Sequence, residues 1–392
     1  MKAIVNGALV TPREVLYGKT ILFGETVEGI ADSAAPLPAD VETVDARGGF
    51  VLPGFIDLHV HGGGGYDFLD GDPGAIDAIL RLHAAHGTTA LFATTLTCPD
   101  AVLFAGVERL AAAIGRGSPA DGSALLGIHL EGPWLSPSNV GAQAVAGERT
   151  PTACELDRLL ALSAGTIARI DAAPELSSGI DLLSAFASEH GILLSVAHSA
   201  ANAETTLAAY EKGFTHITHL YCSTTTEHKE GQTVHAGIVE AAYLNDGITV
   251  ELIGDGKHIP RETMLLCFKI KGAEKVALVT DAMRAAGTDA RTSILGEKTT
   301  GTPVLVEDGV AKLRDRSSFA GSVATMDVCF KTALRYGVPL PDAARSCALT
   351  PAEIAGVADK RGSLDVGKVA DVLIFDPDFN LQSVFIKGKR IR

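Results

Sequence analysis

Eight short apolar segments, most of them followed by a stretch of helical length, fill residues 53–352 and constrain the fold more than any other feature. Apolar runs of this length are typical of strands that are buried on both faces, as in a parallel sheet. Eight such units in about 300 residues predict a (β/α)₈ barrel, and a doubly wound sheet, the alternative, usually has fewer strands. The predicted strands are residues 55–61, 89–97, 124–132, 167–175, 192–199, 215–221, 248–258 and 275–282.

Both ends of the chain show the period-two alternation and glycine-rich turns of β structure. Residues 1–52 and 353–392 therefore predict the two parts of one small β-sandwich. Residues 53–352 between them form the predicted catalytic domain. We expect an α/β fold in which a (β/α)₈ TIM barrel carries a β-sandwich domain built from both terminal segments.

The charge of the chain narrows its range of partners. A net charge of −14 argues against nucleic acid or an anionic membrane surface, because both require a basic face. An anionic small molecule stays open as a substrate, since it needs only a local positive site. No stretch approaches the roughly 18 uncharged apolar residues of a membrane span.

The cysteines and the first residues indicate the compartment. None of the six cysteines forms a CxxC pair, so we expect free thiols rather than a redox motif or a thiolate zinc site. Residues 1–24 alternate like strands and lack the long apolar core of a signal peptide. These features predict a cytoplasmic protein.

Polar residues stand at the ends of six of the eight predicted strands, where a buried strand normally carries Val or Ile. In an α/β barrel the carboxyl ends of the strands form the active site. A cluster of metal-binding side chains there predicts a metal centre. The residues are His59, His61, Glu131, His198, His219, Asp255, His258 and Asp281.

Two sets of these residues suit a metal. His59 and His61 are two apart on one strand, so they point to the same face and can share an ion. The set of Glu131, His198 and His219 offers one carboxylate and two imidazoles, which suit Zn²⁺ or Fe²⁺ with an open position. Taken singly, each histidine also fits a hydrogen-bonded core position.

The role of Asp281 and the identity of the metal stay open at this point. Asp281 suits a further ligand, a general base or the cap of the next segment. Imidazole and carboxylate ligands suit Zn²⁺, which we expect first, as well as Fe²⁺, Mn²⁺ and Co²⁺. The residues allow one or two ions per subunit.

The motifs PGFIDLHVHGGGG, GIHLEGPWLSP, AHSAA, THL, DGKHIP, LVTDAM and FAGS follow one another in this order. Together they resemble the motif set of the N-acetylglucosamine-6-phosphate deacetylases of the amidohydrolase superfamily, from about residue 50 to 370. HxH alone indicates only the superfamily, whereas HLEGP with the later motifs is specific to the deacetylase branch. The resemblance implies a metal-dependent hydrolase that deacetylates an N-acetyl amino sugar, N-acetylglucosamine-6-phosphate first, and that forms a homodimer.

The resemblance also implies roles for individual residues. The metal would make water a nucleophile near neutral pH, and the catalytic aspartate would take its proton and pass it to the leaving amine. His59 and His61 match a pair that holds a second metal in some members. The matching residues are Glu131, His198 and His219 as metal ligands, Asp281 as the catalytic residue and His258 as a contact to the sugar.

The sequence departs from the family where the sugar phosphate is held. The family usually has Asn-Ala and a later arginine after THL, whereas this chain has Cys222 and Ser223 and no arginine in residues 222–240. His228 and Lys229 are the cationic candidates there, and lysine binds phosphate as a point charge rather than as a fork. The departure predicts an altered grip on the substrate.

The sequence also departs from the family at the position of Gln143. Gln143 stands where the family tends to have a histidine near the substrate carbonyl, and glutamine does not titrate near neutral pH.

Alternative functions stay open. The substrate can be the galacto epimer or an unphosphorylated sugar, or the enzyme can cleave an N-acyl amino acid or a cyclic amide. IARIDAAPE lacks the lysine of a carbamylated bridge, and Asp281 argues against a non-catalytic binding protein.

Overall fold

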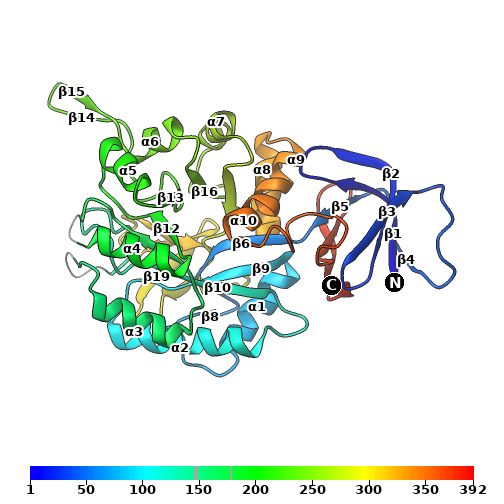
Figure 1. The fold of residues 1–392 in the computed structure, drawn as a ribbon, viewed down its shortest axis with the longest axis horizontal. Coiled ribbons are helices and arrows are strands. Elements are labelled where there is room, and N and C mark those ends of the chain that lie inside the picture. The colour runs from blue at the N-terminus through cyan, green and yellow to red at the C-terminus, as the bar shows by residue number, and fades with distance from the viewer. Residues whose placement is uncertain (145–148, 177–178) are drawn as a thin grey trace.

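The structure is a computed structural model that describes residues 1–144, 149–176 and 179–392. Figure 1 shows a large α/β part and a smaller β part at one end, with both chain termini in the smaller part. No helix among the described residues is both long and apolar enough to cross a bilayer.

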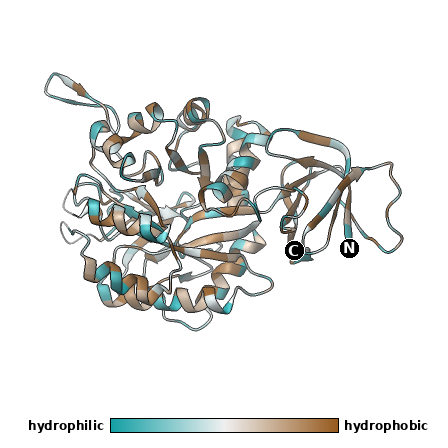
Figure 2. Cartoon of the chain, in the orientation of Figure 1, coloured by the Kyte–Doolittle hydropathy of each residue, from teal (hydrophilic) through white to brown (hydrophobic). Residues whose placement is uncertain are grey.

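The large part is built on eight parallel strands in the order β17-β16-β13-β12-β11-β10-β9-β6. Backbone hydrogen bonds of 2.9 Å from Asp281 N to His59 O and from His61 N to Ala282 O join the two ends of the sheet. Figure 2 shows hydrophobic residues along most of these strands, as expected of a sheet buried on both faces. The strands are β6 (Phe55–Val60), β9 (Thr88–Thr94), β10 (Ala124–Glu131), β11 (Ile167–Ala172), β12 (Leu193–Val196), β13 (Phe214–Ile217), β16 (Thr249–Ile253) and β17 (Val276–Val279).

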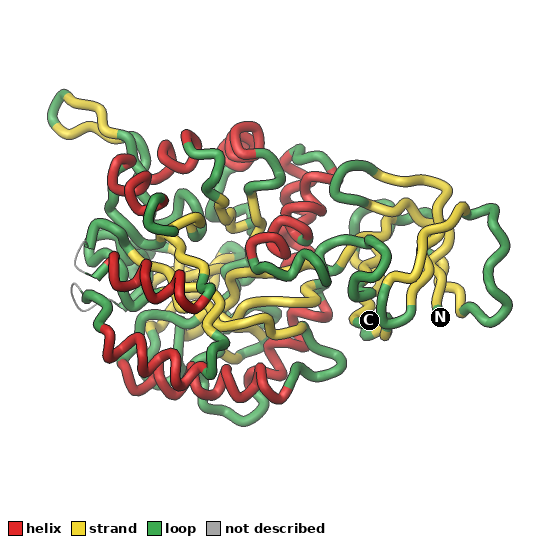
Figure 3. The backbone as a smooth tube through the Cα atoms, in the orientation of Figure 1, coloured by secondary structure: helices red, strands yellow, loops and turns green. Residues whose placement is uncertain are grey.

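The predicted (β/α)₈ barrel is therefore confirmed, with each predicted strand in its place. Helices connect most of the strands and cover the outside of the barrel (Figure 3). Several begin at residues suited to cap a helix. The side chain of Thr152 accepts a hydrogen bond from Glu155 N, and that of Asn202 accepts one from Thr205 N.

The helices occupy the following residues: α1 (Ala75–Ala85), α2 (Asp100–Arg116), α3 (Ala153–Ser163), α4 (Ile180–His190), α5 (Ala203–Tyr210), α6 (Ile238–Leu244), α7 (Arg261–Lys271), α8 (Met326–Tyr336), α9 (Leu340–Cys347) and α10 (Leu349–Ile354).

Three smaller β elements interrupt the barrel. A four-stranded antiparallel sheet follows β17 and consists of β18 (Thr292–Leu295), β19 (Thr302–Glu307), β20 (Val310–Leu313) and β21 (Phe319–Ser322). A short ribbon of β7 (Gly62–Gly63) and β8 (Tyr66–Asp67) follows β6. The hairpin of β14 (His228–Glu230) and β15 (Thr233–His235) projects from the barrel (Figures 1 and 3).

The small β part joins both ends of the chain, which confirms that predicted feature of the fold. Its sheet runs β24-β23-β22-β5-β1-β2-β3, and β4 also pairs with β1. The antiparallel pairing of β22 with β5 joins the two terminal segments in one sheet. The strands are β1 (Lys2–Val10), β2 (Val15–Phe23), β3 (Val27–Asp32), β4 (Glu42–Asp45), β5 (Phe50–Pro53), β22 (Val372–Phe375), β23 (Leu381–Ile386) and β24 (Lys389–Arg390).

This sheet bends at β1, which bonds to β4 through residues 2–5 and to β5 through residues 8–9. The bend lets the sheet enclose a separate hydrophobic core that includes Phe23, Val51 and Phe385. The boundaries predicted from the sequence, after residues 52 and 352, stay a proposal.

Candidate active site

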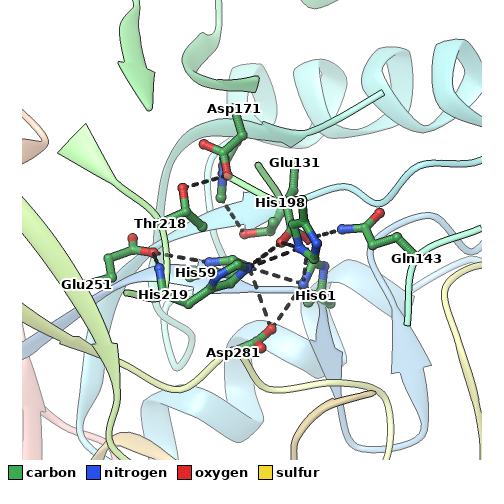
Figure 4. Close-up of polar contacts among 12 residues, drawn as sticks. His59, His61, Glu131, Gln143, Asp171, His198, Thr218, His219, Glu251 and Asp281 are labelled. Atoms are coloured by element: carbon green, nitrogen blue, oxygen red, sulfur yellow. Dashed lines mark hydrogen bonds and ion pairs between the residues drawn. The ribbon is translucent and has the colours of Figure 1, made fainter. Parts of the chain in front are cut away.

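Six side chains with metal-binding atoms meet at one end of the barrel (Figure 4). They come from the carboxyl ends of five strands, which a parallel barrel brings together. All six are buried, and none is more than 7% exposed. They are His59 in β6, His61 directly after it, Glu131 at the end of β10, His198 after β12, His219 after β13 and Asp281 after β17.

The first cluster consists of Glu131, His198 and His219. Oε1 of Glu131 lies 3.0 Å from Nε2 of each histidine, and the two Nε2 atoms are 3.2 Å apart. Ligands that surround a metal tetrahedrally at about 2.0 Å lie about 3.3 Å from one another. The three atoms therefore have the spacing of three ligands around a single ion.

The second cluster consists of His59, His61 and Asp281. Its two Nε2 atoms are 3.2 Å apart, and Oδ1 of Asp281 lies 3.5 Å from that of His59 and 3.2 Å from that of His61. Oε2 of Glu131 lies 3.3 Å from Nε2 of His61. Glu131 thus stands between the two clusters and can serve an ion in either.

The backbone is unusual at three of the six residues. His198, His219 and Asp281 have φ angles of 42°, 29° and 49°, in the left-handed region that residues other than glycine seldom occupy. Such a conformation costs about 1–2 kcal/mol per residue. Strain of this kind clusters at functional sites, where the surrounding structure supports it.

The carboxylates make the site favourable for positive charge. Burial would lower the pKa of His61, but Asp281 and Glu131 outweigh it and raise that pKa to about 9. Burial is likewise outweighed at His59, whose pKa lies well above its usual range because of the same two carboxylates. Burial would raise the pKa of Glu131 and of Asp281, but imidazoles, with that of His59 first, lower both. A divalent cation suits this donor set, and it would replace the protons on the histidines.

A cavity of about 240 Å³ opens beside the two clusters. Four residues predicted to contact the substrate line it: Gln143, Cys222, Ser223 and His258. Burial raises the pKa of the Cys222 thiol. The thiol is therefore neutral, and it offers a polarizable surface rather than a thiolate.

Gln143 lies against the metal-binding residues. Its Nε2 donates to Oε2 of Glu131 at 2.6 Å, and its Oε1 accepts from Thr97 N at 2.8 Å. Both ends of the amide are thus occupied, so Gln143 orients Glu131. The predicted place of Gln143 near the substrate carbonyl stays a prediction.

His258 has one ring nitrogen in use. Nδ1 lies 2.8 Å from Oδ2 of Asp255 and donates to it. Nε2 has no hydrogen-bond partner among the described residues, so it can accept one from a ligand in the cavity. The ring of Phe319 lies 4.8 Å from that of His258, and it also lines the cavity. Phe319 was not predicted as a site residue, although it begins the FAGS motif.

His228 and Lys229 do not line this cavity in their own chain. Both are exposed in β14 of the projecting hairpin. No Lys or Arg occurs among the described residues that line the cavity. A phosphate group bound there would therefore lack a cationic side chain from the described part of the same chain.

A layer of charged residues deeper inside the barrel than the two clusters was also not predicted. Arg169 and Asp171 in β11 and Glu251 in β16 are fully buried in the barrel. The signal was present in the sequence, because charged residues interrupt two otherwise apolar strands, IARIDAAPE and ITVELIG.

Known proteins resemble this chain over nearly its full length. The model of the amidohydrolase family matches residues 50–391. An N-acetylgalactosamine-6-phosphate deacetylase of Escherichia coli O157:H7 is 32% identical over 366 residues, which is 92% of each chain. An N-acetylglucosamine-6-phosphate deacetylase of Vibrio furnissii is 32% identical over 342 residues, 87% of this chain and 82% of that one.

The solved structures agree with this. The crystal structure of an N-acetylglucosamine-6-phosphate deacetylase from Pasteurella multocida matches with a TM-score of 0.89 and 30% identity. The match covers 99% of both chains, so it includes the barrel and the small β part.

Proposed function

The chain belongs to the N-acetylglucosamine-6-phosphate deacetylase family of amidohydrolases, and from that premise we propose that it removes the acetyl group of N-acetylglucosamine-6-phosphate. The products are acetate and the amino sugar phosphate. The family match already makes the chain a hydrolase of amide bonds. Because one similar protein is named for the galacto epimer, N-acetylgalactosamine-6-phosphate is the second candidate substrate.

The observation that carries the proposal is the convergence of two ligand clusters on Glu131. The donor atoms of each cluster lie within 4.8 Å of one another, at the strand ends where a barrel enzyme acts. Their spacing and their three-donor composition fit a divalent ion with an open position, and we propose Zn²⁺. Bound Zn²⁺ would supply an acidified water and polarise the amide carbonyl.

Asp281 moves the proton in the proposed reaction. Imidazoles lower the pKa of its carboxyl, so it is ionised at neutral pH and can accept a proton from the attacking water. It then passes that proton to the amine nitrogen as the amide bond breaks. Gln143 meanwhile orients Glu131, to which it donates at 2.6 Å.

His258 fits the sugar. Its Nδ1 is fixed by Asp255, so Nε2 accepts a hydrogen bond from a sugar hydroxyl. Cys222 and Ser223 line the same cavity, and we propose both as substrate contacts.

A substrate panel tests the proposal. Acetate release is measured with both 6-phosphates and with both unphosphorylated sugars, and the metal content is determined on the same preparation. We expect turnover of at least one 6-phosphate by protein that contains a divalent metal. Metal-loaded protein that releases no acetate from any of the four sugars contradicts the function. Equal turnover of the phosphorylated and unphosphorylated sugars contradicts only the proposal that the enzyme recognises the phosphate.

We also infer a homodimer in which the hairpin of one copy reaches the other. The hairpin projects from the barrel, and its Val234 is 56% exposed, which leaves apolar surface without a partner among the described residues. A second copy would bring Lys229 toward a cavity that has no cation lining it in the described chain. Light scattering in solution tests the dimer, and a monomer at all concentrations contradicts it.

A cytoplasmic location remains part of the proposal. All six cysteines are unpaired, three of them buried, as expected of a protein in a reducing compartment. Fractionation of the native cells checks the location.

A further inference from the structure

The charged layer below the metal clusters contains a carboxylate that contacts a ligand histidine. Glu251 points from β16 into the barrel and is fully buried. A carboxylate in such a position must be paired. Both Nη atoms of Arg169 donate to it, and Nη2 does so at 3.2 Å. Arg169 therefore fixes Glu251 in place and offsets its charge.

The oxygen that accepts from Nη2 of Arg169, Oε2, also faces His59 and accepts from the backbone N of His219 at 3.4 Å. Oε2 of Glu251 lies 3.2 Å from Nδ1 of His59, whereas Nε2 of the same ring faces His61 and Asp281. Glu251 is thus on the far side of the imidazole from the cluster. A carboxylate only accepts, so Nδ1 carries the proton and Nε2 presents its lone pair to the cluster.

The other three ligand histidines are held differently. Nδ1 of His198 donates to the backbone carbonyl of Asn139 at 3.2 Å. Nδ1 of His61 and Nδ1 of His219 are buried and have no hydrogen-bond partner in the described part of the chain. Among the four described ligand histidines, only His59 has a carboxylate on its outer nitrogen.

We propose that Glu251 is the positioning residue of the second cluster, holding His59 in the Nδ1–H tautomer so that the cluster of His59, His61 and Asp281 binds an ion. Carboxylates in this position orient a ligand imidazole and increase its basicity. The inference rests on the proposed metal site, but it does not depend on the sugar substrate.

The substitution Glu251→Gln changes the charge and the hydrogen-bonding pattern of the side chain but not its size. Glutamine has the shape of glutamate, but one of its two polar atoms is a donor. If the amide nitrogen takes the place of Oε1, it opposes the Nη1 donor of Arg169. If it takes the place of Oε2, it opposes Nη2 of Arg169 and demands the opposite tautomer of His59, with a proton on Nε2, where the ion would bind. Either orientation weakens the second cluster.

The matched control is Asp171→Asn. Asp171 is equally buried and accepts from the same guanidinium, with Nε of Arg169 at 2.9 Å. Its Oδ2 accepts from Thr218 at 2.8 Å and lies 2.9 Å from Nε2 of His129, and neither residue is a proposed metal ligand. The control therefore disturbs the charged layer without a direct hydrogen bond to a ligand histidine.

Titration of the metal-free proteins with Zn²⁺ against a chromophoric chelator measures the affinity of each ion. We expect Glu251→Gln to bind one ion about 10- to 100-fold more weakly than the wild type. The affinity for the other ion should change less, because Glu251 contacts the first cluster only through the backbone N of His219. Asp171→Asn should bind both ions as the wild type does. Wild-type affinity for both ions in folded Glu251→Gln overturns the proposal, as does equal weakening in the control.

A measurement on the wild type covers the case in which the variant fails to fold. Histidine-selective nitrogen NMR of the Zn²⁺-loaded protein reports which ring nitrogen carries the proton, with His59 assigned from a His59→Gln variant. We expect a protonated Nδ1 and a metal-bound Nε2 at His59. The opposite tautomer, or a His59 ring free of metal, overturns the proposal.

Discussion

His219 of the first cluster and the projecting hairpin are close in the sequence, but their surroundings in the structure differ. His219 follows its strand, is 3% exposed and has its Nε2 3.2 Å from that of His198, whereas His228, nine residues later, lies exposed on a projecting ribbon. The eight-stranded barrel fixes the first position, because every strand end must fit its neighbours. A surface hairpin has no such constraint, so its sequence can vary more freely.

The largest expected effect comes from Asp281 at the buried end of this comparison. Asp281→Asn keeps the shape of the side chain but cannot accept a proton, so kcat should fall about 100- to 10,000-fold. The metal content is measured in parallel, since Oδ1 of Asp281 also lies 3.2 Å from His61 in the second cluster. Variant protein that keeps its metal and its hydrolytic rate contradicts the role as base.

Removal of a shared ligand should separate the two clusters. Glu131 contacts both, whereas His61 belongs to one. We expect Glu131→Gln to lower the affinity for both ions, and His61→Asn to lower the affinity for one, each by about 100-fold or more. Even residues that contact only a ligand contribute about 10- to 100-fold to metal affinity. Zinc titration of the two purified variants measures this. If Glu131→Gln lowers the affinity for one ion only, Glu131 belongs to a single cluster.

The contrast also explains which features the sequence predicts. The HxH spacing predicts that His59 and His61 point to the same face of a strand, and the carboxylate at the end of an apolar run singles out Glu131. The pairing of Arg169 with Glu251 was not found, because the two charges lie 82 residues apart and neutralise each other only when the barrel closes. Local pattern identifies strand ends, but it does not identify partners across the barrel.

The same limit applies outside the barrel. The match of residues 222–240 to the family's phosphate segment makes His228 and Lys229 the cationic candidates for the substrate, but the hairpin carries both away from the cavity of their own chain. The four-stranded sheet of residues 292–322, which lines the cavity through Leu295 and Phe319, is not among the predicted strands. Both segments depend on tertiary contacts rather than on periodicity.

A smaller effect, on stability, is expected from His83, which lies beside the HxH pair of the second cluster. His83 is fully buried in α1, and its Nε2 donates to the carbonyl of Gly62, directly after His61. Burial lowers its pKa from 6.5 to about 4, so the folded protein holds it neutral. The unfolded chain takes up a proton as the pH falls below about 6.5, and the folded protein does so only near pH 4. Stability is therefore lost across this window, by up to about 3 kcal/mol.

The variant His83→Gln keeps a donor for Gly62 and removes the titrating group. Its free energy of unfolding should fall less steeply than that of the wild type between pH 6.5 and pH 4, as measured by denaturant titration at each pH. Part of the acid sensitivity persists, because burial also lowers the pKa of His129 to about 4. Identical slopes for both proteins would show that protonation of His83 does not contribute.

The smallest effect tests the exposed side of the comparison. If Lys229 contacts the phosphate across a dimer, Lys229→Ala should raise KM for the 6-phosphate about 10-fold, which corresponds to about 1.4 kcal/mol for one charged contact. The KM for the unphosphorylated sugar and the metal content should not change, because the hairpin is remote from the ligand set. Lys212→Ala is the control, since Lys212 is an exposed lysine whose salt bridge, at 2.6 Å, is to surface Asp181. An unchanged KM for the 6-phosphate would remove the hairpin from the substrate site, and the phosphate would then have to be bound by neutral donors such as Ser223 in the cavity.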